Sequence, residues 1–186
     1  MRARVTVYPR KEILDPQGKA IEGALKSLGV AGVKGFGGGF SGASGAEFGE
    51  PEMKAFIRHT KERSEALESA LASLQTDVRV ALMHYAPIRE TLQGEPPEIF
   101  PFLGSYLLAE AVDRSGADLV IHGHAHRGTE YGVTPGGVNV RNVAQTVIRQ
   151  AYAVYGFETA TRRREPATTG ASRHGPSPTT RTNTDR

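Results

Sequence analysis

The chain has 186 residues, 38% of them hydrophobic, and no cysteine. This length allows one domain with a core, while disulfides and thiolate metal ligands are excluded. The net charge of +3 is concentrated in residues 159–186, where six arginines face only Glu165 and Asp185. The remainder is near neutral and lacks interleaved basic and aromatic residues, so nucleic acid is not an expected partner.

No apolar stretch approaches the ~20 residues of a membrane span. The N-terminus also lacks the apolar segment of a signal peptide. We therefore expect a cytoplasmic protein that makes no contact with a membrane.

The first elements expected along the chain are a strand and a helix. Residues 2–8 alternate as in a half-buried strand. A helix is predicted from Pro16 to Leu28, with Asp15 as its N-cap and Gly29 as its stop.

Residues 29–45 are rich in glycine. Val30 to Val33 are predicted to form a short strand, and the rest is too glycine-rich for a regular element. A flexible linker and a loop that approaches a ligand are both open interpretations. The loop is favoured because Phe36 and Phe40 are unusual in a solvated linker.

A long helix is predicted from Pro51 to about Leu74, followed by a strand over 78–83. The apolar stripe expected on this helix is Met53, Phe56, Ile57, Leu67, Ala70, Leu71 and Leu74.

The next helix is predicted from Ser105 to Arg114, with Ser105 as its cap and Gly116 as its stop. A strand over 118–121 follows, so the order strand, helix, strand predicts a right-handed parallel crossover. Two further strands are expected over 138–143 and 151–157. From Thr159 onward no large apolar residue occurs, and we expect a disordered tail.

Three histidines follow the two strands of this crossover. His84 comes after the first, and His124 and His126 come after the second. The carboxyl ends of parallel strands meet at one edge of a sheet, where ligands collect. Residues i and i+2 of an extended chain point to one side, and imidazoles suit divalent transition metals. His84, His124 and His126 are therefore predicted metal ligands, whereas His122 is expected to pack inside the strand.

Arg89 and Arg127 follow the two histidine motifs and are candidate substrate-binding residues. An arginine can hold a phosphate through two parallel hydrogen bonds. Two solvated arginines are an equally good interpretation.

The motifs His84-Tyr-Ala-Pro87 and Gly123-His-Ala-His126 resemble the carboxyl-terminal half of the calcineurin-like metallophosphoesterases. The resemblance runs over about residues 30–157 and includes Gly35-Phe-Gly-Gly-Gly-Phe40 and Gly94-Glu-Pro-Pro-Glu-Ile-Phe100. It implies an α/β fold, a truncated metallophosphoesterase sandwich that keeps its parallel βαβ crossover. It also implies a phosphate-ester substrate.

The resemblance further implies two divalent metal ions (Mn, Fe or Zn) that clamp the phosphate and generate a hydroxide. In that family His84 and His124 would ligate the second metal, and His126 the first. The family's upstream motifs, Asp-x-His, Gly-Asp and Gly-Asn-His, do not occur here. We therefore expect weak hydrolysis or none, with no catalytic residue assigned.

The segment Glu12-Ile-Leu-Asp-Pro-Gln-Gly-Lys-Ala-Ile-Glu22 is similar to the start of the PurS subunit of phosphoribosylformylglycinamidine synthase. This resemblance covers about residues 1–29. The expected organisation is thus a PurS-like strand and helix (1–29), a metallophosphoesterase half (30–158) and a basic tail (159–186).

Three alternatives remain open from the sequence. In the first, the chain is a non-catalytic PurS-like subunit that associates with purine-synthesis proteins through residues 1–29. In the second, it is a mononuclear zinc protein with His84, His124, His126 and water as ligands. In the third, it is an unstable fragment without a function.

Overall fold

The computed structural model describes residues 2–7 and 18–158, and the exposure of side chains over 23–156. The strands are β1 (Arg2–Val7), β2 (Val30–Gly32), β3 (Gly39–Phe40), β4 (Ala43–Ser44), β5 (Val80–Leu82), β6 (Leu119–His122), β7 (Tyr131–Val133), β8 (Asn139–Asn142) and β9 (Ala153–Glu158). The helices are α1 (Gly18–Ser27), α2 (Pro51–Ala72), α3 (Phe100–Leu103), α4 (Tyr106–Ser115) and α5 (Gln145–Ile148), with 3₁₀ turns η1 (Glu90–Leu92) and η2 (Pro97–Ile99). Within these described residues, no helix combines the length and the apolar character needed to cross a membrane.

The architecture is mixed α/β around a five-stranded sheet with the order β2-β5-β6-β8-β7. All neighbours are parallel except β7 and β8, which are antiparallel at one edge. Every residue of β6 is buried, as expected for the middle of a parallel sheet with both faces covered. Strands β5 and β6 are adjacent and parallel, so the predicted pairing of these two strands is confirmed.

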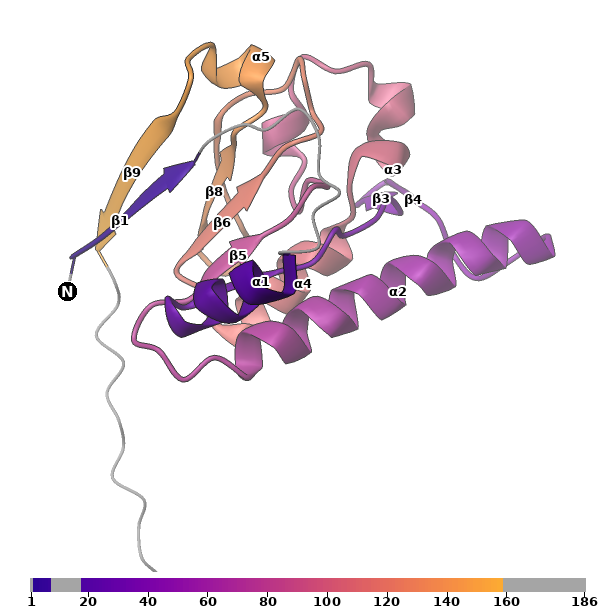
Figure 1. The fold of residues 1–186 in the computed structure, drawn as a ribbon. Helices are drawn as coiled ribbons and strands as arrows, with labels where there is room; N and C mark the ends of the chain where they lie inside the picture. Colours follow the sequence, from indigo (N-terminus) through magenta and orange to yellow (C-terminus); the bar gives the residue numbers. More distant parts are fainter. Residues whose placement is uncertain (1, 8–17, 159–186) are drawn as a thin grey trace, which may run out of the picture.

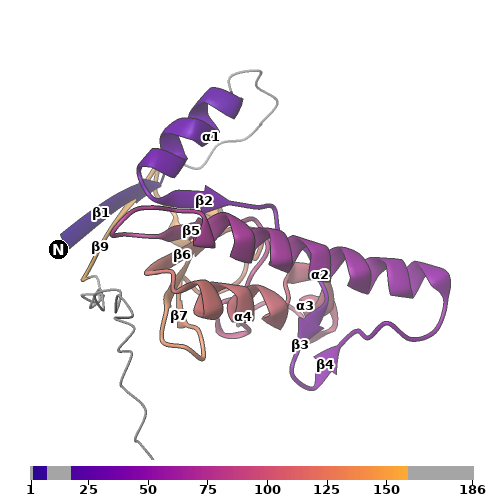
Figure 2. The ribbon, with the colours of Figure 1, turned by 90° about the horizontal axis from the view of Figure 1, so that it is seen from below.

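Helices α2 and α4 contact each other and lie against one face of the sheet (Figures 1 and 2). The main core lies between them and the strands, and includes Leu67, Leu71, Leu108, Val112 and Val120. Leu67 and Leu71 of α2, and Leu108 and Val112 of α4, are each four residues apart, which is why the two helices bury one stripe each. The opposite face of the sheet carries a smaller cluster with Val80, Leu119 and Ile121.

One residue of the predicted α2 stripe is exposed. Met53 is 53% exposed, whereas Ile57, Leu67 and Leu71 are buried. Figure 1 shows the reason, because the N-terminal end of α2 extends past the strands of the sheet. The helical period is therefore correct there, but that turn lies beyond the strands of the sheet.

Helix α4 begins and ends where the sequence predicts. The Ser105 side chain accepts a hydrogen bond from the backbone N–H of Leu107, and Gly116 adopts a left-handed conformation with a φ of 64°. A serine oxygen satisfies one of the free N–H groups of the first turn, and glycine adopts positive φ without strain.

Replacing Ser105 by alanine is expected to lower the free energy of unfolding by about 1 kcal/mol, because the Leu107 N–H loses its acceptor. Urea denaturation of the two proteins measures the difference. Ser73→Ala is the matched control, since the Ser73 hydroxyl bonds the Ala70 carbonyl at the exposed end of α2. Equal losses in both variants would contradict a capping role for Ser105.

The glycine-rich segment differs from its prediction. It is a packed loop, as favoured, but it also contains the short antiparallel pair β3 and β4. The tight turn depends on Gly39, whose φ is 93° and where an added Cβ would overlap the Ala43 carbonyl oxygen. Gly37 to Phe40 are all buried. Glycine is thus used here for close backbone approach, not for flexibility.

The two ends of the described chain meet. Strand β1 pairs with β9 as a separate antiparallel sheet, in which Arg2 lies opposite Glu158 and Val7 opposite Ala153. The predicted strand over 2–8 is therefore present as Arg2–Val7. The predicted cap Asp15 and first helical residue Pro16 lie outside the described residues, and so does the basic tail over 159–186.

Candidate functional site

Three parallel strands end side by side and carry basic side chains just beyond their ends. Lys34 follows β2, His84 follows β5, and His124 follows β6. Backbone hydrogen bonds join the three segments, because His84 N–H donates to the Lys34 carbonyl at 3.0 Å and Gly123 N–H donates to the His84 carbonyl at 3.2 Å. We call Lys34, His84 and His124 the histidine edge.

The His84 and His124 rings lie together, with their centroids 4.5 Å apart. The Tyr85 ring packs against His84 at 5.4 Å and against His124 at 4.7 Å. The expectation that the two histidine motifs emerge at the same carboxyl edge is therefore confirmed. His124 has a φ of 68°, a left-handed conformation that is uncommon outside glycine. Such a conformation persists only where the surrounding contacts hold it.

Asn142, at the end of β8, supplies contacts that hold this loop. Its amide nitrogen donates to the Ala125 carbonyl at 2.8 Å, and its amide oxygen accepts from the Ala144 N–H at 3.1 Å. The side chain is fully buried. One asparagine thus fixes the segment between His124 and His126 and also the chain that follows β8.

His122 lies in the core of the sheet and not in the site, as expected. Its Nδ1 lies 2.8 Å from the Gly123 carbonyl, and its Nε2 lies 2.8 Å from the Thr91 hydroxyl. A carbonyl oxygen only accepts, so Nδ1 carries the proton and Nε2 accepts from Thr91. Burial lowers the pKa of His122 to about 4, because its effect is larger than the opposing effect of the hydrogen bond to Gly123, which raises the pKa. His122 is therefore neutral near pH 7.

The two histidines of the edge also have lowered pKa values. For His84 partial burial is the largest cause, followed by the positive charges of His124, Lys34 and His126. For His124 burial again lowers the pKa, while a hydrogen bond to the Phe102 backbone raises it in part. Both imidazoles favour their neutral forms, in which one ring nitrogen keeps a lone pair. Lys34 is the cation beside them.

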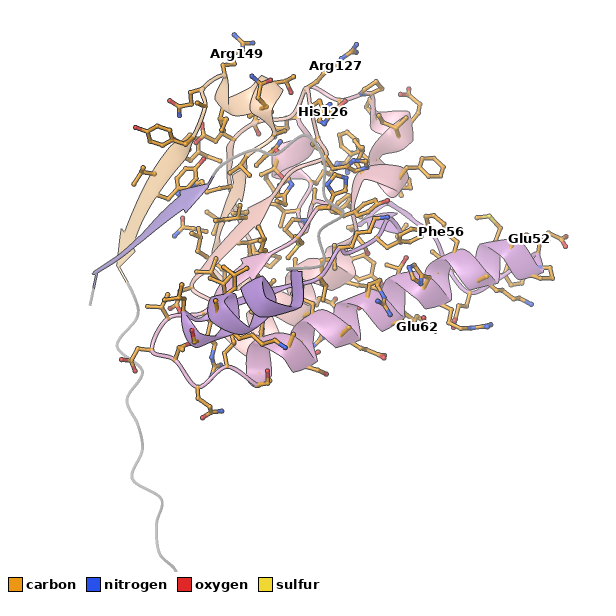
Figure 3. The ribbon with its side chains drawn as sticks, in the orientation of Figure 1. Glu52, Phe56, Glu62, His126, Arg127 and Arg149 are labelled. Atoms are coloured by element: carbon orange, nitrogen blue, oxygen red, sulfur yellow. The ribbon has the colours of Figure 1, made fainter. Side chains whose placement is uncertain are left out.

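His126 is exposed and lies beside Arg127, close to α5 (Figure 3). Its backbone carbonyl accepts from the Thr146 hydroxyl at 2.6 Å. Within residues 2–7 and 18–158, however, no three histidine or carboxylate side chains form a group that could hold a metal. The described side chains therefore do not fit a three-ligand centre as they stand, and we derive no step through a metal. The ligand set His84, His124 and His126 stays a prediction.

The two arginines lie on neighbouring loops. Arg127 is exposed, and its backbone N–H donates to a Glu95 carboxylate oxygen at 2.8 Å. The Arg89 guanidinium lies 5.5 Å from the Phe100 ring centroid and lines a hollow of about 390 Å³ together with Glu95. A larger hollow of about 830 Å³ lies between the β3–β4 turn, α4 and β7, and none of the three histidines lines it. The role of Arg89 and Arg127 in phosphate binding stays a prediction.

Sequence reasoning did not identify Lys34 or Asn142 as parts of this site. Lys34 carries a usable signal, because it follows a predicted strand just as His84 does. Asn142 carries none, since its two hydrogen-bond partners depend on how β8 lies against the loop after β6.

The class defined by these observations is a mixed α/β protein with a basic, histidine-containing edge on a mostly parallel sheet. The family model of PurS, described as phosphoribosylformylglycinamidine (FGAM) synthase, matches residues 2–37. This is less than half of the chain, and it supports the PurS-like beginning over a longer segment than the predicted 1–29. No curated protein and no solved structure matches the chain. The metallophosphoesterase resemblance therefore has only the sequence motifs behind it.

Proposed function

We propose that the histidine edge binds the phosphate group of a phosphate ester, and that this chain hydrolyses such esters slowly or not at all. The observation that carries the proposal is the 4.5 Å separation of the His84 and His124 rings beside Lys34 at the carboxyl ends of three parallel strands. Ligands commonly bind outside the carboxyl ends of such strands.

The side chains of the edge suit a phosphate group. Lys34 supplies a positive charge, and ammonium groups bind phosphate as point charges. The neutral His84 imidazole can donate its one N–H to a phosphate oxygen. The neutral His124 imidazole gives its one N–H to the Phe102 backbone, so it donates to phosphate in its protonated form, which a bound anion favours. Weak hydrolysis is part of the proposal, because the carboxylate-bearing motifs of the metallophosphoesterases do not occur upstream. The interpretation of the sheet as a truncated metallophosphoesterase sandwich is also part of the proposal.

Replacing Lys34 by methionine is expected to weaken the binding of inorganic phosphate about tenfold, because a charge-assisted hydrogen bond is lost. Titration calorimetry at pH 7 measures the dissociation constants. Lys54→Met, on the exposed side of α2, is the matched control and should leave the constant unchanged. Equal constants in wild type and Lys34→Met would contradict phosphate binding at this edge.

Hydrolysis and metal binding are tested on the same protein. We expect slow release of 4-nitrophenol from bis(4-nitrophenyl) phosphate, or none. Any release that the wild type shows should fall at least tenfold in the His84→Ala/His124→Ala double variant. His59→Ala is the control, since His59 is exposed on α2.

Elemental analysis distinguishes the metal hypotheses: two ions per chain support the metallophosphoesterase pair, and one zinc supports a mononuclear site.

A second candidate function is association with purine-synthesis subunits through the PurS-like segment. The match over residues 2–37 favours it, and the comparisons support it more directly than the first candidate. Among the described strands, β1 pairs only with β9. We infer that a strand from a partner adds to the edge of β1 opposite β9.

This second candidate is tested by co-purification of the full chain with the other subunits of the synthase. We expect the wild-type chain and His124→Ala to retain the subunits and Val5→Pro to lose them, because proline removes a backbone donor from β1. Failure of the wild-type chain to retain any subunit would contradict the association.

A further inference from the structure

A row of aromatic rings leads away from the histidine edge. From the His124 ring, centroid distances are 4.7 Å to Tyr85, 5.6 Å from Tyr85 to Phe36, and 5.0 Å from Phe36 to Phe56. The row ends at Phe102, whose centroid lies 6.2 Å from that of Phe56. We call Tyr85, Phe36, Phe56 and Phe102 the aromatic row. All its spacings lie in the range of packed aromatic pairs.

The row joins four separate segments of the fold. Phe36 and Tyr85 follow β2 and β5, Phe56 comes from α2, and Phe102 comes from α3. In Figure 3, Phe56 lies on the side of α2 that faces α3. The His59 ring packs edge-on against Phe36 at 4.6 Å. The rings are therefore held from several sides, and Phe102 is the member that remains open.

Phe102 is 61% exposed, whereas Phe100 and Leu103 of the same short helix are buried. Its ring is thus not needed to fill the core. Its backbone lies near enough to the His124 ring to raise the pKa of that histidine, so this exposed ring belongs to a residue beside the histidine edge. Single exposed apolar residues are ordinary, but this one continues a packed row that begins at the phosphate-binding residues.

We propose that Phe102 stacks against a planar aromatic ring carried by the phosphate ester whose phosphate lies at the histidine edge. The inference rests on the proposed function and deepens it by naming the substrate class as aromatic phosphate esters. A phenylalanine face favours offset or edge-on contact with another ring, and stacking of a base on an aromatic side chain strengthens binding markedly. An aliphatic phosphate ester gains none of this ring contact.

The test compares two probes that differ only in the aromatic group, adenosine 5′-monophosphate and ribose 5-phosphate. Titration calorimetry should give about tenfold tighter binding of the nucleotide by the wild-type chain. Phe102→Ala should abolish this preference and leave ribose 5-phosphate binding unchanged, whereas Phe102→Trp should keep it. Phe48→Ala is the matched control, because Phe48 is 87% exposed on the loop before α2.

A second pair of probes, phosphotyrosine and phosphoserine, distinguishes a phenyl ring from a nucleobase. A Phe102-dependent preference in either pair supports the inference and identifies the ring. Equal affinities in both pairs, or a preference that survives Phe102→Ala, overturn it. Circular dichroism of Phe102→Ala is expected to match the wild type, because the side chain is largely exposed.

Failure of the two proposals can be told apart. If inorganic phosphate and ribose 5-phosphate bind but the aromatic probes gain nothing, the stacking inference fails and the phosphate site stands. If neither phosphate binds, but adenosine alone binds in a Phe102-dependent manner, the phosphate site fails and the stacking surface stands.

Discussion

Replacing Asn142 by alanine is expected to lower the free energy of unfolding by about 3 kcal/mol and to weaken phosphate binding. The Asn142 amide satisfies the buried Ala144 N–H and donates to the Ala125 carbonyl. Each buried polar group that loses its partner costs about 1–3 kcal/mol. After the substitution the Ala125 carbonyl keeps only the longer 3.3 Å hydrogen bond from Gly128. The left-handed conformation of His124 then loses part of the framework that holds it.

Urea denaturation and phosphate calorimetry together measure this effect. Asn139→Ala is the matched control, because Asn139 begins the same strand and is only half-buried. We expect the control to change stability by less than about 1 kcal/mol and to leave phosphate binding intact. An Asn142→Ala protein as stable as the control would contradict the supporting role of Asn142.

The second large effect is a loss of stability in acid that depends on His122. Its pKa is about 4 in the folded chain, compared with 6.5 for an ordinary histidine. Between these values the unfolded chain binds a proton that the folded chain does not. The stabilisation is therefore fully present above pH 6.5 and is lost as the pH falls toward 4. The loss amounts to about 3 kcal/mol.

Urea denaturation of wild type and His122→Gln at pH 7, 5.5 and 4.5 measures this dependence. The wild type should lose stability steeply over the series, and the variant should lose much less of it. The pKa values of His84 and His124 are lowered as well, so a smaller dependence of the same sign should remain in the variant. His59→Gln, an exposed control, should follow the wild type. Parallel curves for wild type and His122→Gln would contradict the assignment.

The parts of the fold that were predictable depend on local signals. Ser105 and Gly116 mark both ends of α4 because capping and left-handed termination involve only neighbouring residues. The meeting of His84 and His124 was predictable because parallel strands align their carboxyl ends. These rules need the order of the elements and no knowledge of side-chain packing.

The parts that were not predictable depend on contacts between distant segments. Asn142 acts on the loop after β6, and the backbone of Phe102 in α3 affects the pKa of His124, which follows β6. The pairing of β1 with β9 joins opposite ends of the described chain. No periodicity or motif near either strand indicates that partner.

The PurS-like beginning and the histidine edge also overlap in the sequence. The family match ends at Gly37, beyond Lys34. The sequence motifs instead place the boundary between the PurS-like and metallophosphoesterase-like segments after residue 29. Strand β2 therefore belongs both to the matched segment and to the sheet that carries the two histidines. Within the proposed phosphate site, Lys34 belongs to the segment that the PurS model matches, and His84 and His124 lie beyond it.

The most direct test of the central claim is the nuclear magnetic resonance of the histidine side chains during a titration with inorganic phosphate at pH 7. If the histidine edge binds phosphate, the imidazole signals of His84 and His124 shift together and saturate, while the signal of His59 on α2 stays in place. The same shifts should weaken about tenfold in Lys34→Met. Shifts of equal size at all three histidines, or none at His84 and His124, would contradict phosphate binding at this edge.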